Sequence, residues 1–111
     1  MACLSVGLDT REREGALHVE LSGELDISSA AAVESRLLEL EDGNAPERVI
    51  LDLRAVSFLD STGLSLLINV DRRLRSEGRR LTVVSGTGAP HRILEISGLG
   101  SHIEIVEDLD S

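Results

Sequence analysis

The chain has few of the residues on which membrane proteins, secreted proteins and nucleic-acid-binding proteins depend. Its 111 residues include no Trp, no Tyr, one Phe and one Cys. The single cysteine, Cys3, cannot form an intramolecular disulfide, which is typical of a reducing compartment. No apolar run is long enough to cross a bilayer, and the first residues lack the basic and apolar segments of a signal peptide. The sequence therefore predicts a cytoplasmic protein that does not insert into membranes.

Lysine is also absent, since all 11 basic residues are arginines. This excludes Schiff-base chemistry, a catalytic lysine and the lysine of a phosphate-binding P-loop. His18, His91 and His102 have no metal-ligand spacing to one another or to Cys3. Asp60 beside Ser61 does not indicate a hydrolase, because the chain has no GxSxG turn. We therefore expect no catalytic residue, no cofactor and no metal site.

Acidic residues outnumber basic ones, and the net charge at pH 7 is −9. Such a charge repels phosphate backbones, and there is no Tyr or Trp to stack on bases, so direct nucleic-acid binding is not expected. Five arginines nevertheless gather near the end of a predicted helix. They complement the carboxyl end of that helix, and they also offer a basic patch to an acidic partner; these arginines are Arg72, Arg73, Arg75, Arg79 and Arg80.

Strand-like and helix-like apolar spacings take turns along the chain. Residues 3–22 alternate with period two on either side of a charged turn, which predicts two antiparallel strands. Helical stretches then separate the buried strands 48–53 and 81–84 and a short last strand near 103–106, and the last helix begins at Pro90, with Ile93, Leu94 and Ile96 facing inward. This order predicts an α/β domain over residues 1–111, with a mixed, mostly parallel sheet, an N-terminal antiparallel hairpin, helices packed against the sheet and a frayed acidic tail at about 107–111.

A polar turn, Asp60-Ser61-Thr62-Gly63, lies where a buried strand leads into the second long helix. Ser61 is suited to be the N-cap of that helix, because its hydroxyl could accept a hydrogen bond from a first-turn amide. Such a cap stabilises a helix by about 1 kcal/mol. Capping would explain Ser61, but it would not explain the residues around it.

The helix after this turn, predicted to end near Glu77, has one stripe that should face the sheet. A rotation of 100° per residue places five residues on that stripe, namely Gly63, Leu66, Leu67, Val70 and Leu74. Leu64 and Ile68 lie on a flank between the stripe and the polar face. A second apolar flank is either additional core or a docking patch for a partner, and the core is the commoner role for each residue taken alone.

Several segments resemble the STAS domain of the bacterial anti-sigma factor antagonists. These are SGELD at 22–26, VILDL at 49–53, FLDSTGLSLL at 58–67 and ILEISGLGSHIEI at 93–105. The resemblance covers nearly the whole chain in the same order, and the DSTG turn is its most specific part. It implies a single STAS-like domain that works as a binding protein and not as an enzyme.

The resemblance also implies a partner-switching mechanism in the regulation of transcription. The unphosphorylated antagonist binds an anti-sigma factor that is also a serine kinase, and this releases a sigma factor. The kinase then phosphorylates the serine that matches Ser61, binding ends, and a serine phosphatase restores it. Asp26 matches an acidic residue near the phosphorylated turn, and Asp60 and Gly63 match the neighbours of the acceptor. Thr62 offers an adjacent hydroxyl and is the second choice of acceptor.

The expected partner-binding residues are Asp26, Asp60, Ser61, Thr62 and Gly63, with Leu64 and Ile68 as a docking patch. A phosphate at a helix N-terminus is locally favourable, so the sequence predicts a binding switch and not a folding switch in a monomer or weak homodimer. Two other functions remain open: an accessory subunit of a membrane transporter and a scaffold subunit of a stress-signalling assembly. A ligand-binding or nucleotide-hydrolysing domain is disfavoured by the missing lysine.

Overall fold

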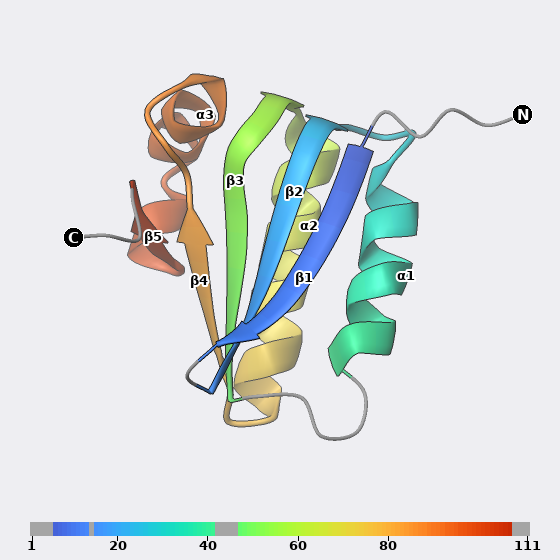
Figure 1. Ribbon diagram of the computed structural model, residues 1–111. Helices are drawn as coiled ribbons and strands as arrows, with labels where there is room; N and C mark the ends of the chain where they lie inside the picture. Colours follow the sequence, from blue (N-terminus) through green and yellow to red (C-terminus); the bar gives the residue numbers. More distant parts are fainter. Residues whose placement is uncertain (1–5, 14, 42–46, 108–111) are drawn as a thin grey trace, which may run out of the picture.

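The computed structural model, which describes residues 6–13, 15–41 and 47–107, has a five-stranded sheet with helices packed against it (Figure 1). The sheet order is β1 (Val6–Arg13), β2 (Ala16–Leu25), β3 (Arg48–Leu59), β4 (Arg80–Val84) and β5 (Glu104–Val106). β1 and β2 are antiparallel, and the other neighbours are parallel. The predicted fold class is therefore confirmed, whereas Cys3 and the tail at 108–111 lie outside the described residues.

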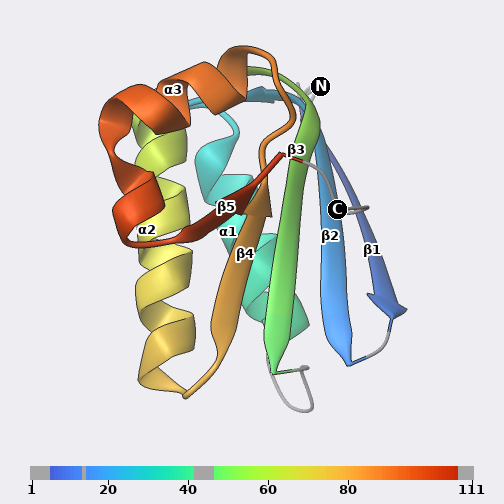
Figure 2. The same cartoon turned by 90° about the vertical axis from the view of Figure 1, so that its left-hand side faces the viewer.

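The helices explain why the core lies on one side of the sheet. α1 (Ala30–Glu41) and α2 (Ser61–Ser76) cover one face, and α3 (Ala89–Ser97) lies across the carboxyl end of β4 (Figures 1 and 2). Alternate strand residues such as Leu21 and Leu51 point into this layer and are fully buried. The α2 residues buried against them are the five predicted from helical spacing: Gly63, Leu66, Leu67, Val70 and Leu74.

The last helix differs from its prediction at one position. Leu94 is buried and Ile93 is partly buried, but Ile96 is exposed. α3 ends at Gly98, whose φ of 77° is left-handed, and the chain turns into the short 3₁₀ helix η1 (Leu99–Ser101). This turn brings Leu99 into the core in place of Ile96, because a left-handed residue redirects the chain after a helix.

β2 and β3 run further than their sequence patterns predicted. β4 pairs with β3 only as far as Asp52, and beyond that point β3 pairs with β2 alone, out to the pair Leu25 and Leu59. Two register shifts interrupt this extension. Bulges of this kind break the alternation of buried and exposed residues, so residues 54–57 were expected to form a connection and not a strand.

Asp52 fixes the point at which β3 leaves the body of the sheet. Asp52 alternates with the core residues Leu51 and Leu53, so it points to the opposite face of the sheet, where its side chain is only 5% exposed. Its carboxylate accepts hydrogen bonds from the Arg54 amide at 3.0 Å and the Arg54 guanidinium at 2.7 Å. Burial alone would raise the pKa of Asp52, but the hydrogen bonds and charge of Arg54 more than offset it and hold this pKa below its usual value. The carboxylate therefore stabilises the first bulge.

We predict that Asp52→Asn lowers the free energy of unfolding at pH 7 by about 1–2 kcal/mol, since it weakens charge-assisted hydrogen bonds. A carboxyl whose pKa is lowered in the folded state adds stability above its unfolded pKa of about 3.9, and this stability is lost as the pH falls through the folded value. Urea denaturation between pH 7 and pH 2.5 should therefore show a flatter acid limb for Asp52→Asn than for the wild type.

The control is Asp9→Asn, the same change at an exposed position of β1, which should stay within about 0.5 kcal/mol of the wild type at pH 7. Parallel pH profiles for the wild type and Asp52→Asn would contradict the role given to this carboxylate.

Candidate functional site

The candidate site lies where β2 and β3 end and α2 begins, at the top of Figure 1. Leu25 pairs with Leu59 at the last position of the two strands, and the Asp60 amide donates a hydrogen bond to the Leu25 carbonyl at 3.4 Å. Asp26 and Asp60 each follow directly after a paired residue, so the fold places them next to each other. Residues far apart in the sequence are thus brought to one end of the sheet.

Asp60, and not Ser61, caps α2, which corrects the prediction from the sequence. One Asp60 carboxylate oxygen accepts the Thr62 amide at 2.9 Å and the Gly63 amide at 3.1 Å. Asp60 has the extended backbone of an N-cap, with φ −110° and ψ −171°, and Ser61 is already the first helical residue. Aspartate and serine cap helices about equally well, so residue type alone could not decide between the two positions.

The cap of α2 does not involve the Ser61 hydroxyl. Ser61 is exposed, and no described residue forms a hydrogen bond with its side chain. Thr62 is only partly exposed. The turn therefore presents one accessible hydroxyl at a helix N-terminus, directly beside the carboxylate that holds the first amides of that helix.

Gly63 allows α2 to approach the strand ends closely. A Cβ atom at this position would lie 2.9 Å from the Leu25 carbonyl oxygen and would overlap the Leu59 side chain. Real Cβ atoms do not come so near to backbone oxygens. The predicted role of Gly63 as part of the site is thus accompanied by a structural requirement that any larger residue would break.

Asp26 organises the turn between β2 and α1. Its carboxylate accepts the Ser28 hydroxyl at 2.7 Å and the Ser28 amide at 3.0 Å, and it lies 3.4 Å from the Ser29 hydroxyl. The Ser28 hydroxyl is the main cause that holds the pKa of Asp26 below its usual value. Burial is the next largest effect and raises this pKa, and the hydrogen bonds from the Ser28 and Ser29 amides and the Ser29 hydroxyl lower it further. Asp26 is therefore a fixed negative charge beside the Ser61 turn.

Leu64 and Ile68 lie further along α2 than the other predicted residues, about one and two turns after the cap. Both are partly exposed, and both pack against the core. The fold thus brings Asp26, Asp60, Ser61, Thr62 and Gly63 together at one end, while Leu64 and Ile68 continue from this end down one flank of the helix.

At the same end of the sheet lie two exposed apolar residues that the sequence patterns do not identify. Ile27, which follows Asp26, is 79% exposed, and Phe58, which pairs with Glu24 just before the site, is 46% exposed. Large apolar side chains left in water next to a polar turn are typical contact points for a protein partner. The available signal was Phe58 as the only aromatic residue, and Ile27 as an apolar residue inside a polar turn.

A second polar cluster, Ser85, His91 and Glu95, has the order of contacts of a catalytic triad but lacks an accessible serine and free amides beside it. Ser85 Oγ lies 2.9 Å from His91 Nδ1, and His91 Nε2 lies 2.8 Å from Glu95 Oε1. Ser85 is only 1% exposed. The amides of Ser85 and Gly86 already donate to the carbonyls of Val106 and Glu107, so these amides cannot stabilise an oxyanion. The cluster connects α3 to the sheet.

The described part of the chain offers neither a cluster of metal ligands nor a membrane-spanning helix. No group of three or more His, Cys, Asp or Glu residues there could hold a metal ion. Of the helices described, none is both long enough and apolar enough to cross a membrane.

Comparisons with known proteins agree on one family. The model of the STAS domain matches residues 7–111. The anti-sigma-B factor antagonist of Bacillus subtilis (strain 168) is 28% identical over 102 residues, which cover 92% of either chain. A crystal structure of an anti-sigma factor antagonist from Mycobacterium paratuberculosis is 30% identical, with a TM-score of 0.85 over 98% of this chain and 92% of that one.

A more distant structure shares the fold. The Bacillus cell fate determinant SpoIIAA in its phosphorylated form is 19% identical, with a TM-score of 0.69 over 94% of this chain and 95% of that one.

The cap assignment predicts different effects for two neighbouring substitutions. Asp60→Ala should lower the free energy of unfolding by about 1 kcal/mol, because it removes the acceptor of two first-turn amides. Asp60→Asn should retain most of this stability, and Ser61→Ala should change it by less than about 0.5 kcal/mol. Urea denaturation measures all three, and a larger loss for Ser61→Ala than for Asp60→Ala would restore Ser61 as the cap.

The close approach at Gly63 predicts that Gly63→Ala destabilises the protein by about 1–3 kcal/mol through overpacking, although alanine favours helices. Gly100→Ala is the matched control, because a Cβ there meets nothing closer than 4.0 Å and should leave stability nearly unchanged. Thermal and urea denaturation test this pair, and equal stabilities of the two variants would show that α2 can move away from β2 without cost.

Proposed function

The chain belongs to the STAS domain family, and from that premise we propose that it acts as an anti-sigma factor antagonist controlled by phosphorylation of Ser61. The names of its relatives support the first part of this proposal. The observation that carries the second part is the exposed Ser61 hydroxyl at the start of α2, to which no described residue forms a hydrogen bond. No enzymatic activity is part of the proposal.

The proposed cycle has two states. The unphosphorylated chain binds an anti-sigma factor with serine kinase activity and so releases its sigma factor. The kinase transfers a phosphoryl group to Ser61, which ends the binding, and a serine phosphatase restores the first state. The greater exposure of Ser61 than of Thr62 supports Ser61 as the acceptor, and SpoIIAA, which has the same fold, is known in a phosphorylated form. We place this cycle in the cytoplasm, with the chain as a monomer or weak homodimer.

The proposed contact surface for the anti-sigma factor surrounds Ser61. It contains the polar residues Asp26, Asp60 and Thr62, with the buried Gly63 beneath them, and it extends along α2 through Leu64 and Ile68. We add Ile27 and Phe58, because their exposure beside the turn supplies the apolar contact that a protein interface needs at its centre.

Electrostatics explains why a phosphate should end binding without unfolding the chain. Phosphorylation adds a charge of about −1.5 to −2, and a helix N-terminus tolerates such a charge. The amides of Thr62 and Gly63 are already bound to Asp60, so the phosphate gains little from them. It lies instead beside Asp60 and Asp26, so that surplus negative charge faces the partner. Removing this charge from water in the interface costs free energy and weakens binding.

An affinity pull-down tests this proposal, with the purified wild-type and variant chains as baits and an extract of the source cells as the source of partners. Wild-type and Ser61→Ala chains should both retain a serine-kinase anti-sigma factor, and Ser61→Asp should lose it. For the purified partner we expect affinity to fall at least about thirtyfold upon phosphorylation, since a misplaced interfacial charge costs about 2–5 kcal/mol. Mass spectrometry after incubation with the kinase and ATP should place the phosphate on Ser61.

Thr62→Ala is the matched control, and it should be phosphorylated as the wild type is. A phosphate on Thr62, or partner binding that is indifferent to residue 61, would refute the switch. Retention of transporter subunits instead of an anti-sigma factor would refute the assigned function and leave the fold intact.

A further inference from the structure

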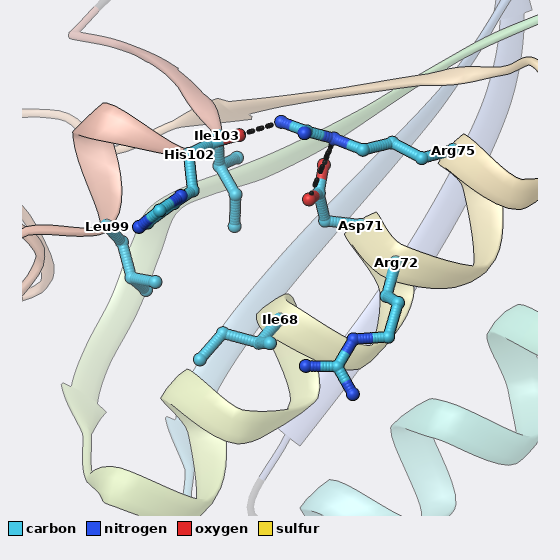
Figure 3. A pocket seen from close by; sticks show the side chains of 7 residues that line it. All are labelled: Ile68, Asp71, Arg72, Arg75, Leu99, His102 and Ile103. Atoms are coloured by element: carbon cyan, nitrogen blue, oxygen red, sulfur yellow. Dashed lines mark hydrogen bonds and ion pairs between the residues drawn. The ribbon is translucent and has the colours of Figure 1, made fainter.

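A groove separates α2 from the segment that joins η1 to β5 (Figure 3). It has a volume of about 420 Å³, which is within the range of about 300–1,000 Å³ seen for ligand sites. Ile68, Leu99 and Ile103 form an aliphatic floor, and polar side chains from both elements form the rim. The groove therefore combines an apolar base with charged edges on the helix that begins at Ser61.

Contacts of Arg75 close the groove at the end that lies away from Ser61. The Arg75 guanidinium donates to the His102 carbonyl and binds the Asp71 carboxylate at 3.1 Å (Figure 3). Asp71 is thereby neutralised by Arg75. The acidic group on the rim thus has its counter-charge in place, and it does not oppose an incoming anion with a full negative charge.

Arg72 is the remaining charged group of the rim. It is exposed, and it forms no ion pair or hydrogen bond with any described residue. On a chain with a net charge of −9, the Arg72 guanidinium is thus a positive charge without a described partner at the edge of the groove. An adjoining hollow is lined by three arginines, Arg75, Arg79 and Arg80, against two carboxylates, Asp71 and Glu104. Complementary charge would come from carboxylates on whatever occupies the groove.

We propose that this groove docks an acidic, leucine-bearing segment of a protein partner. An aliphatic side chain would rest on Ile68, Leu99 and Ile103, and a flanking carboxylate would pair with Arg72. The inference rests on the proposed function only in taking the occupant to be a protein. The groove lies about 10–20 Å from Ser61 along the helix axis, so docking in it does not depend on the phosphorylation state of Ser61.

The first test uses the full chain and a fluorescein-labelled hexapeptide with two leucines flanked by acidic residues on each side. We expect saturable binding in fluorescence anisotropy. In NMR spectra of the methyl-labelled chain, the signals of Ile68, Leu99 and Ile103 should shift, while that of Ile50 on the opposite sheet face should not. A peptide with Gln and Asn in place of the acidic residues should bind about two- to fivefold more weakly per lost ion pair.

Variants separate the groove from the Ser61 end. Arg72→Gln should weaken the acidic peptide about two- to fivefold, and Ile68→Ser should weaken it about tenfold through lost apolar contact. Arg11→Gln, an exposed arginine on the opposite edge strand, should bind as the wild type does. Ser61→Asp should also bind as the wild type does, even where it has lost the anti-sigma factor.

Several results would overturn the proposal. These are methyl shifts that avoid the groove, equal binding of the acidic and neutral peptides, and peptide affinity that is unchanged in Arg72→Gln. Concentration-dependent shifts of the same methyl groups without peptide would show that a second copy of the chain fills the groove instead. Loss of peptide binding in Ser61→Asp would contradict docking that does not depend on the charge at residue 61, whatever the outcome of the affinity experiment with the anti-sigma factor.

Discussion

The close contact at the Leu25 carbonyl is the constraint on which the site depends. This oxygen accepts the Asp60 amide, and the space beside it is so narrow that only a glycine fits at position 63. The contact fixes the ends of β2, β3 and α2 against one another, and Asp26 and Ser61 become neighbours as a consequence. A larger side chain at Gly63 would separate the fixed charge of Asp26 from the hydroxyl that it flanks.

Within the turn, Asp60 caps the helix and Ser61 presents the hydroxyl that the proposal assigns to phosphorylation. Because its carboxylate satisfies the first-turn amides, the helix does not need the Ser61 hydroxyl, and that hydroxyl can be modified without the loss of a cap. The proposed switch therefore changes charge at the surface and leaves the packing beneath it unaltered. Along the same helix, the groove at Ile68 and Arg72 offers contacts that a phosphate on Ser61 would not reach, so α2 would serve partners at two adjoining places that share Ile68.

The sequence could predict the features that depend on a regular period. The buried stripe of α2 from Gly63 to Leu74 follows from helical geometry, and the parallel strands follow from their apolar runs. The extension of β3 to Leu59 could not be predicted, because its bulges break the period of two. The sequence pattern predicts the N-cap of α2 at Ser61, one residue after the actual cap Asp60, because serine and aspartate cap helices about equally well. The exposure of Ile27 and Phe58 depends on tertiary packing, which no local pattern reveals.

The central claim is that phosphorylation of Ser61 changes what the chain binds and not how it folds. The most direct measurement is the melting temperature of the stoichiometrically phosphorylated chain beside the unmodified one, together with amide NMR spectra of both. We predict melting temperatures within about 2 °C, which corresponds to well under 1 kcal/mol for a domain of this size, and chemical shift changes confined to the turn around Ser61 and Asp26. A large loss of stability, or shifts that extend through the sheet, would contradict this account.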